Sequence, residues 1–67
     1  MSIARITEIS ATSPKSFEDA TQKGIARAVN SLRNVKSAWI KDQIATIEND
    51  KISEYKVHMM VSFVLDD

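Results

Sequence analysis

The sequence predicts an α+β fold of order β-α-β-β, with one helix packed on a curved three-stranded sheet of antiparallel type. Apolar and polar residues alternate over residues 52–66, which is typical of a long strand with one buried face. Apolar residues recur every three or four positions over residues 17–35, which is typical of a helix lying on a sheet. Residues 2–10, rich in β-branched side chains, and residues 36–48 supply the other two strands. A right-handed crossover leaves the third strand between them, antiparallel to both.

The composition indicates a single small domain, residues 1–67, that needs partners. The 67 residues have a formal net charge of zero, no cysteine, one glycine and one proline. A domain of this size buries only about 60% of its unfolded surface, so a monomer would be marginally stable. Because disulfides are absent, oligomerisation is the remaining means of stabilisation. The balanced charge argues against nucleic-acid binding, and no segment approaches the ~20 apolar residues that span a membrane. We therefore expect a self-associating cytoplasmic protein, with neither nucleic acid nor membrane as a partner.

The helix that follows the first strand has two candidate starts. Ser13 can cap a helix that begins at the following proline, and Ser16 with Asp19 forms an alternative pair that resembles a capping box. From either start, the apolar stripe extends the helix to about Asn34. Gly24 costs about 1 kcal/mol relative to alanine inside a helix. Close approach to the sheet and a tolerated weak position explain it equally well.

Asn49 and Asp50 form the turn between the second and third strands, because both residues tolerate left-handed backbone angles. Counting outward predicts the pairs Ile47–Ile52, Ile44–Tyr55, Gln43–Lys56, Ile40–Met59 and Trp39–Met60. Ala38, Ile40 and Ile44 then face the helix, while Ser37, Trp39, Lys41, Gln43 and Ile47 face away from it with Lys56, His58 and Met60. Asp42 falls on the helix side, a flaw that indicates a bulge or a rim.

The third strand is too long for an isolated domain. Fifteen extended residues, 52–66, reach roughly 50 Å at about 3.3 Å per residue. A helix of about 18 residues spans only ~27 Å. The strand must curl or overhang onto a partner, so its ends predict subunit contacts.

These segments together resemble the dodecin family. The resemblance covers essentially the whole chain without gaps and rests on the order and spacing of several short pieces. They are Ala11-Thr12-Ser13-Pro14, Ser16-Phe17, the helix through Ala20, Ile25, Arg27, Ala28 and Leu32, Asn34-Val35, Asp42-Gln43, Tyr55-Lys56-Val57 and Val61-Ser62-Phe63-Val64-Leu65. The resemblance implies that twelve copies form a hollow shell.

The resemblance also implies a flavin-binding or flavin-buffering protein, with stacked flavins (FMN, riboflavin or FAD) between subunits. In this family a tryptophan stacks on the isoalloxazine ring and a glutamine hydrogen-bonds its pyrimidine edge. Ser37 occupies the tryptophan position, Lys56 the glutamine position, and Ile44 a position that is often arginine in bacterial members. Losing the aromatic plane costs on the order of 1 kcal/mol or more, and a lysine cannot accept a hydrogen bond. We expect flavin binding to be weakened or lost.

Ser37, Trp39, Gln43 and Lys56 are the candidate ligand-binding residues on the face away from the helix. Trp39 lies two residues from the family's stacking position, so it is either a displaced stacking platform or a subunit contact, and the second interpretation is favoured. His58 pairs with Lys41 in the predicted register and is interpreted as an interface histidine. Met59 and Met60 point to opposite faces, one toward the core and one toward an interface.

No catalytic or intrinsic metal site is predicted. Asp42, Glu48 and Asp50 lack the spacing of a calcium loop, although some dodecin-like proteins resemble metal-bound shells with an ion on a symmetry axis. One histidine and no cysteine provide no nucleophile–base pair, so an enzyme is not expected. The sequence therefore predicts a dodecin-like homo-oligomer, expected to be a dodecamer, that binds or stores a flavin or related small molecule. The alternative is a flavin-free structural or metal-binding shell.

Overall fold

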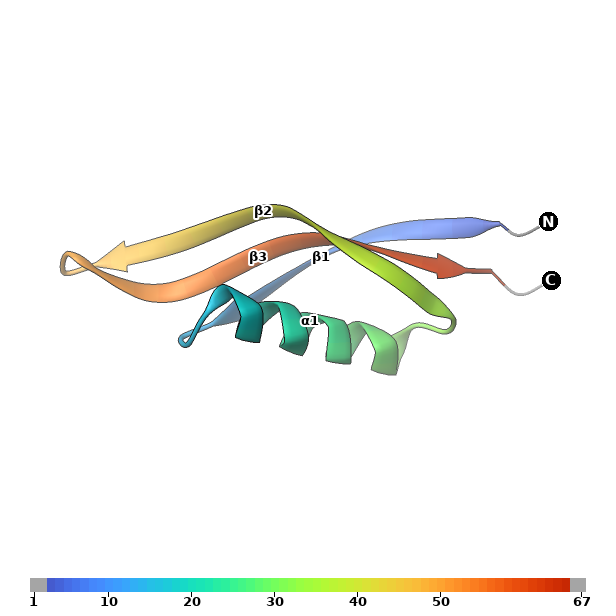
Figure 1. The fold of residues 1–67 in the computed structure, drawn as a ribbon, viewed down its shortest axis with the longest axis horizontal. Helices are drawn as coiled ribbons and strands as arrows, with labels where there is room; N and C mark the ends of the chain where they lie inside the picture. The colour runs from blue at the N-terminus through green and yellow to red at the C-terminus, as the bar shows by residue number, and fades with distance from the viewer. Residues whose placement is uncertain (1–2, 66–67) are drawn as a thin grey trace.

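The computed structural model describes residues 3–65 and has the predicted order of elements (Figure 1). Strand β1 spans Ala4–Ser13, helix α1 Phe17–Ser31, strand β2 Val35–Glu48 and strand β3 Lys51–Val64. Strand β3 is central and pairs antiparallel with both β1 and β2. The helix lies against one face of the sheet, here called the inner face; the opposite face is the outer face. The α+β class and the β-α-β-β topology are confirmed, while Ser2 and Asp66, predicted as strand residues, lie outside the described residues.

Helix α1 begins at the second of its two predicted starts. Ser16 has extended backbone angles, and its hydroxyl accepts a hydrogen bond of 2.9 Å from the backbone N–H of Asp19. Ser13 is not a cap, because β1 continues as far as this residue and pairs it with Tyr55. The strand is therefore three residues longer at this end than the sequence predicted.

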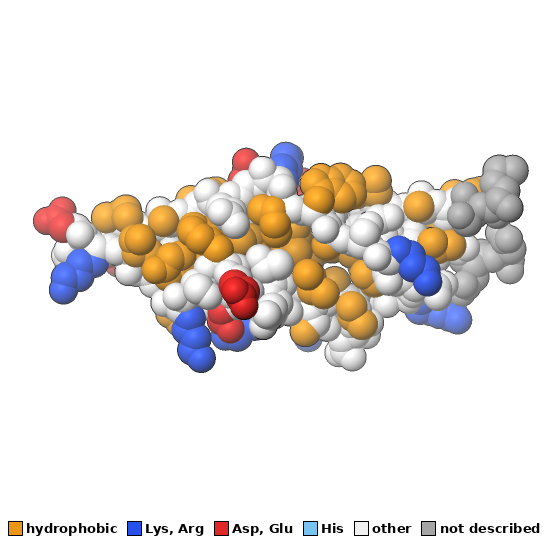
Figure 2. Space-filling model, viewed as in Figure 1, with side chains coloured by type: hydrophobic (Ala, Val, Ile, Leu, Met, Phe, Trp, Pro, Cys, Tyr) orange, Lys and Arg blue, Asp and Glu red, His pale blue; other side chains and the backbone are white. Residues whose placement is uncertain are grey.

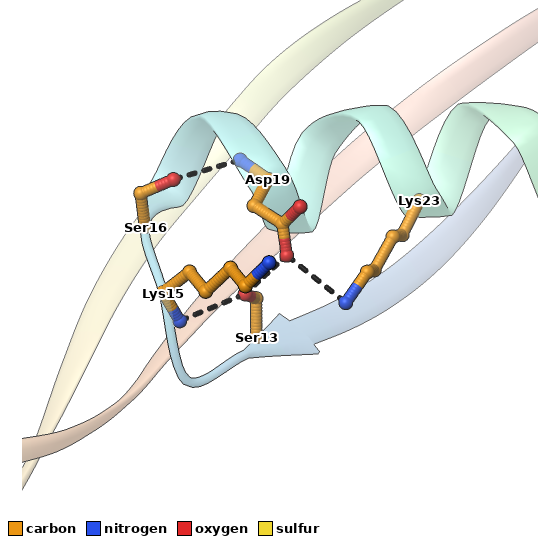
Figure 3. A network of polar contacts seen from close by, with 5 residues as sticks. All are labelled: Ser13, Lys15, Ser16, Asp19 and Lys23. Atoms are coloured by element: carbon orange, nitrogen blue, oxygen red, sulfur yellow. Dashed lines mark hydrogen bonds and ion pairs between the residues drawn. The ribbon is translucent and has the colours of Figure 1, made fainter.

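A small polar network joins the end of β1 to the first turn of α1 (Figure 3). The buried Ser13 hydroxyl donates a 2.6 Å hydrogen bond to the Asp19 carboxylate and accepts one of 3.0 Å from the Lys15 N–H. Lys23 Nζ lies 3.0 Å from the same carboxylate oxygen. The hydrogen bond from Ser13, followed by that from Lys23, holds the pKa of Asp19 below its ordinary value of 3.8. The network therefore favours the ionised carboxylate at the positive end of the helix dipole.

Helix α1 ends at Ser31, earlier than the predicted end at Asn34. Leu32 has an extended backbone, and its N–H still donates to the Ala28 carbonyl at 2.8 Å. Asn34 then takes a positive φ of 59°, which reverses the chain into β2. The extended backbone of Leu32 therefore ends the helix, even though the apolar pattern continues past it.

The core lies between α1 and the inner face and is small. Its buried apolar residues are Ala20, Ala28, Val57, Met59 and Val61. Gly24 is also buried, and a Cβ atom added there would lie 2.7 Å from Met59 Cε and 3.0 Å from Ala11 Cβ. Of the two explanations for this glycine, close approach to the sheet is the one the structure supports. Met59 faces the core, as one of the paired methionines was expected to do.

The turn is confirmed, but the predicted register holds only in part. Asn49 and Asp50 have φ values of 53° and 64°, and Ile47–Ile52, Ile40–Met59 and Trp39–Met60 are paired as expected. The register shifts between Ile40 and Asp42, so the next pairs are Asp42–His58, Gln43–Val57 and Ile44–Lys56. A bulge inserts one residue and exchanges the faces of those beyond it. The predicted pairs of Gln43 with Lys56 and of Ile44 with Tyr55 are therefore wrong. The displaced register extends to Thr46, and a second shift between Thr46 and Ile47 restores the predicted pairing.

The molecule is elongated, with extents of 51 × 19 × 13 Å. Its radius of gyration is 13.8 Å, whereas a compact domain of this length has about 11 Å. Residues 46–54 of the β2–β3 hairpin, here called the arm, project past the start of α1 (Figure 1). Much of the visible surface is hydrophobic (Figure 2). The described residues include no helix long and apolar enough to cross a membrane.

Candidate functional site

The candidate site is the outer face of the sheet, where the strand register places three of the four predicted ligand-binding residues. Ser37 pairs with Ser62, Trp39 with Met60, and Ile44 with Lys56. Side chains two residues apart on a strand share a face, so Ser62, Met60 and Lys56 point away from the helix. Ser37, Trp39 and Lys56 therefore share the outer face as expected.

Gln43 does not share it. The bulge pairs Gln43 with the buried Val57, which places it on the inner side of the sheet. The same shift moves Ile44 from its predicted inner position to the outer face. It also pairs Asp42 with His58, so Asp42 lies on the outer face and not on the helix side where the sequence placed it. The expectation that Lys41 lies opposite His58 is corrected by this pair.

Four charged or titratable residues cross the middle of the outer face, here called the polar belt: Glu8, Lys41, Asp42 and His58. Lys41 Nζ lies 3.5 Å from the Glu8 carboxylate, so this ion pair joins the two edge strands across β3. His58 Nδ1 lies 3.6 Å from Asp42 Oδ2 on the neighbouring strand. Both pairs are partly exposed, and contacts of this kind contribute little stability in a monomer.

Glu8 and the role of Lys41 in this belt were not predicted from the sequence. The position of Glu8 opposite Met60 depends on the register between β1 and β3. The one available signal was the anomaly at Asp42, which marked the bulge. A bulge turns Lys41 and Asp42 toward the same face, and alternation alone cannot show this.

Apolar side chains flank the polar belt on both sides. At one end, Trp39 is 47% exposed beside Met60. Ile6 is also exposed there and pairs with Ser62, two residues beyond Met60 on β3. Toward the arm, Ile44 lies on the same face as Lys56, and Ile47 and Ile52 pair beyond a second register shift, between Thr46 and Ile47. These three isoleucines, here called the isoleucine patch, are 41%, 58% and 49% exposed. A large apolar area left uncovered in the single chain is typical of a subunit or ligand contact.

Two hollows lie beside the helix and are separate from the middle of the outer face. The larger has a volume of about 410 Å³ and lies between α1 and β1. The smaller, about 250 Å³, lies between α1 and the start of β2 and includes Ser37 in its wall. Ser37 thus stands where the outer face meets this second hollow.

Metal-binding side chains are scattered in the described part of the chain. No group of three or more histidine, aspartate or glutamate residues comes together there. Asp42 has His58 as its neighbour, whereas Glu48 and Asp50 lie at the tip of the arm. Within residues 3–65, a single copy does not assemble a metal centre.

The family can now be assigned from comparison with known proteins. The profile of the Dodecin family matches residues 3–66. This chain belongs to the dodecin family. Among curated proteins, it is 29% identical over 63 residues to the calcium dodecin of Mycobacterium tuberculosis, covering 94% of this chain and 89% of the relative.

Solved dodecin structures have the same fold. A dodecin from Streptomyces davaonensis superposes with a TM-score of 0.93 at 30% identity, covering 98% of this chain and 97% of that one. An arginine-to-alanine variant of the Thermus thermophilus dodecin gives 0.93 at 30% identity, covering the whole of both chains. The Mycobacterium tuberculosis calcium dodecin, described as having a calcium-binding site, gives 0.83 at 25% identity, covering 96% and 91%. The suspected family and fold are confirmed.

Proposed function

We propose that this dodecin assembles into a homo-oligomer, expected to be a dodecamer, and holds a flavin or related planar ligand between its copies. The observation that carries the proposal is the exposed outer face, where the indole of Trp39 lies beside the family's stacking position at Ser37. The elongated single chain supports self-association. Its accessible surface is 4972 Å², whereas a monomer of 7.5 kDa exposes about 4,200 Å².

The spacing of the candidate residues supports a site shared between copies. Ser37 pairs with Ser62 of β3. Lys56 lies on β3 itself, six residues before Ser62. This separation corresponds to roughly 20 Å along a strand, about twice the length of a three-ring heterocycle. One ligand therefore meets both positions only if they come from different copies.

We infer that this chain binds flavin more weakly than a dodecin with tryptophan and glutamine at positions 37 and 56. The Ser37 hydroxyl presents no aromatic surface, and the Lys56 ammonium donates hydrogen bonds but accepts none. Trp39 supplies the remaining aromatic plane on this face, displaced by two residues. The Ser37 and Lys56 side chains fit a ligand with an acceptor or anionic edge better than they fit the flavin pyrimidine edge.

The absorbance of the purified protein tests the flavin part of the proposal. Protein that carries a flavin band, or that quenches added riboflavin, supports retained binding. Colourless protein that leaves riboflavin fluorescence unchanged at high protein concentration refutes it. Light scattering on the same sample tests assembly separately, so the two parts of the proposal fail independently.

A calcium-binding shell is the second candidate, favoured by the similarity to calcium dodecin. Carboxylates in the described residues do not cluster within one copy, so this function requires Glu8, Asp42, Glu48 or Asp50 from several copies to meet. Isothermal titration with calcium of the assembled protein, stripped with a chelator beforehand, distinguishes the two candidates. Neither candidate assigns a catalytic residue, and the proposed role is binding rather than catalysis.

A further inference from the structure

The tip of the arm is an apolar knob with acidic residues beside it. Ile47 and Ile52 pair across the two strands and are 58% and 49% exposed. The charged residues beside the isoleucines are Glu48, Asp50, Lys51 and Glu54, and Lys51 pairs with Glu48 across the two strands, so the tip carries an excess of acidic groups. The arm extends away from α1 (Figure 1), and these side chains are exposed in the single chain.

The larger hollow is an apolar groove with a basic margin. Its walls include Ile9 and Ala11 from β1 and Ala28 from α1, and Lys23 and Arg27 also line it. Lys23 is already 3.0 Å from Asp19, which leaves Arg27 as the principal cation available to an incoming acid. Small residues on the helix side open a space of about 410 Å³, enough for branched aliphatic side chains.

We propose that the arm tip of one copy occupies the α1–β1 groove of a second copy of this chain. Ile47 and Ile52 would fill the groove, while Glu48 or Asp50 would face Arg27. The two surfaces match in apolar character and have opposite charge at their margins. This inference rests on the self-association in the proposed function and names the surfaces that carry it.

The contact joins two different surfaces and is therefore heterologous. Such contacts propagate from copy to copy and give a closed assembly when the rotation between copies closes. Every copy supplies one arm and one groove, so loss of either surface affects every contact of this type. The polar belt is not part of this contact, because the groove lies on the opposite side of β1 from it.

Charge exchange tests the pairing directly. Arg27→Glu and Glu48→Arg should each raise the protein concentration needed for assembly about tenfold or more, because like charges then meet at the margin. The combined variant should recover assembly, since each copy then offers an acidic groove margin and a basic arm tip to its neighbours. Lys36→Glu is the matched control, because Lys36 is a cation lining the smaller hollow, and assembly should persist.

The outcome separates this inference from the proposed function. Wild-type protein that is monomeric by light scattering would refute self-association itself. Wild-type oligomer with unimpaired Arg27→Glu and Glu48→Arg variants would refute only the arm–groove contact. Loss of assembly in Lys36→Glu alone would assign the tip to the smaller hollow and would likewise overturn the inference.

Cysteine crosslinking provides a second readout that does not depend on charge variants folding well. The chain has no cysteine, so Ile47→Cys protein mixed with Ser31→Cys protein can form a disulfide only between copies. Ser31 lines the groove from the helix, and Thr7→Cys samples the strand wall. We expect crosslinked dimers in at least one of these mixtures after subunit exchange and mild oxidation. Dimers with Ser37→Cys, from the smaller hollow, and none with either groove variant would contradict the proposal.

Discussion

At positions 37 and 56 lie the two side chains that we propose set the chemistry of the ligand site. In this proposal, Ser37 and Lys56 stand in place of an aromatic plane and of an amide that both donates and accepts hydrogen bonds. Because both lie on the exposed outer face, substitution there should alter ligand binding without disturbing the buried core. Substitutions at these two positions therefore test the flavin hypothesis most directly.

The combined variant Ser37→Trp with Lys56→Gln should bind riboflavin at least tenfold more tightly than the wild type, or about 1.4 kcal/mol. The indole restores a stacking surface and the amide restores a donor and an acceptor. Fluorescence quenching of riboflavin measures the affinity. Ser37→Ala with Lys56→Gln is the control without a stacking plane. A combined variant that assembles correctly but shows no gain would mean that Ile44 or Trp39 closes the site.

Trp39 should distinguish a subunit anchor from a displaced ligand platform. Trp39→Ala should weaken assembly by light scattering if the indole is buried between copies, because a large apolar contact is lost. If the indole is a platform, assembly should persist and ligand quenching of its fluorescence should disappear. As the single tryptophan in the chain, it reports this site alone. Water-like emission from the intact wild-type oligomer would contradict both interpretations.

Among the secondary-structure elements, the junction of β1 and α1 depends on one carboxylate. Asp19→Asn should lower stability, because the Ser13 hydroxyl and Lys23 lose their charged acceptor. Since the folded pKa of Asp19 is lowered, its stabilising contribution is complete above the ordinary value of 3.8 and disappears as the pH falls through the folded pKa. Urea unfolding at equal protein concentration should show a difference from wild type at neutral pH that shrinks in acid. A difference independent of pH would contradict this role.

The packing of α1 on the sheet depends on Gly24. Gly24→Ala should destabilise the protein by about 1 kcal/mol, because overpacking costs roughly 1–3 kcal/mol and outweighs the gain of about 1 kcal/mol in helix propensity. The added methyl would crowd Met59 and Ala11 at 2.7 and 3.0 Å. Asn30→Ala, at an exposed position of the same helix, is the control and should be neutral or stabilising. Thermal unfolding that shows Gly24→Ala to be the more stable variant would contradict the close approach.

For the whole molecule, the small core and the projecting arm make assembly the expected state. Light scattering at micromolar concentration should give a particle many times heavier than the 7.5 kDa chain. The physical reason is that burial of the outer face and the isoleucine patch supplies apolar contact that the single chain lacks. A stable monomer would contradict this prediction.

Periodicity was enough to predict the element order. The handedness of the crossover predicted the antiparallel pairing of β3 with both neighbours, and the residue types predicted the Asn49-Asp50 turn. Apolar side chains must reach one core, so a period of two or of three to four residues appears in the sequence wherever one face is buried. Ser37, Trp39 and Lys56 were placed on the correct face for the same reason. Positions 37 and 39 precede the bulge after Ile40, and Lys56 lies on the part of β3 that pairs without a shift from Glu54 to His58.

Tertiary structure decided which side chains meet beyond that point. The bulge between Ile40 and Asp42 moves Gln43 to the inner side and brings Ile44 to the outer face. Pairing with β3 extends β1 to Ser13 and leaves Ser16 as the helix cap. Both outcomes depend on hydrogen bonding between strands distant in sequence. A one-residue insertion in a ladder changes the faces of the residues that follow it, here as far as the second shift after Thr46, without changing the local composition.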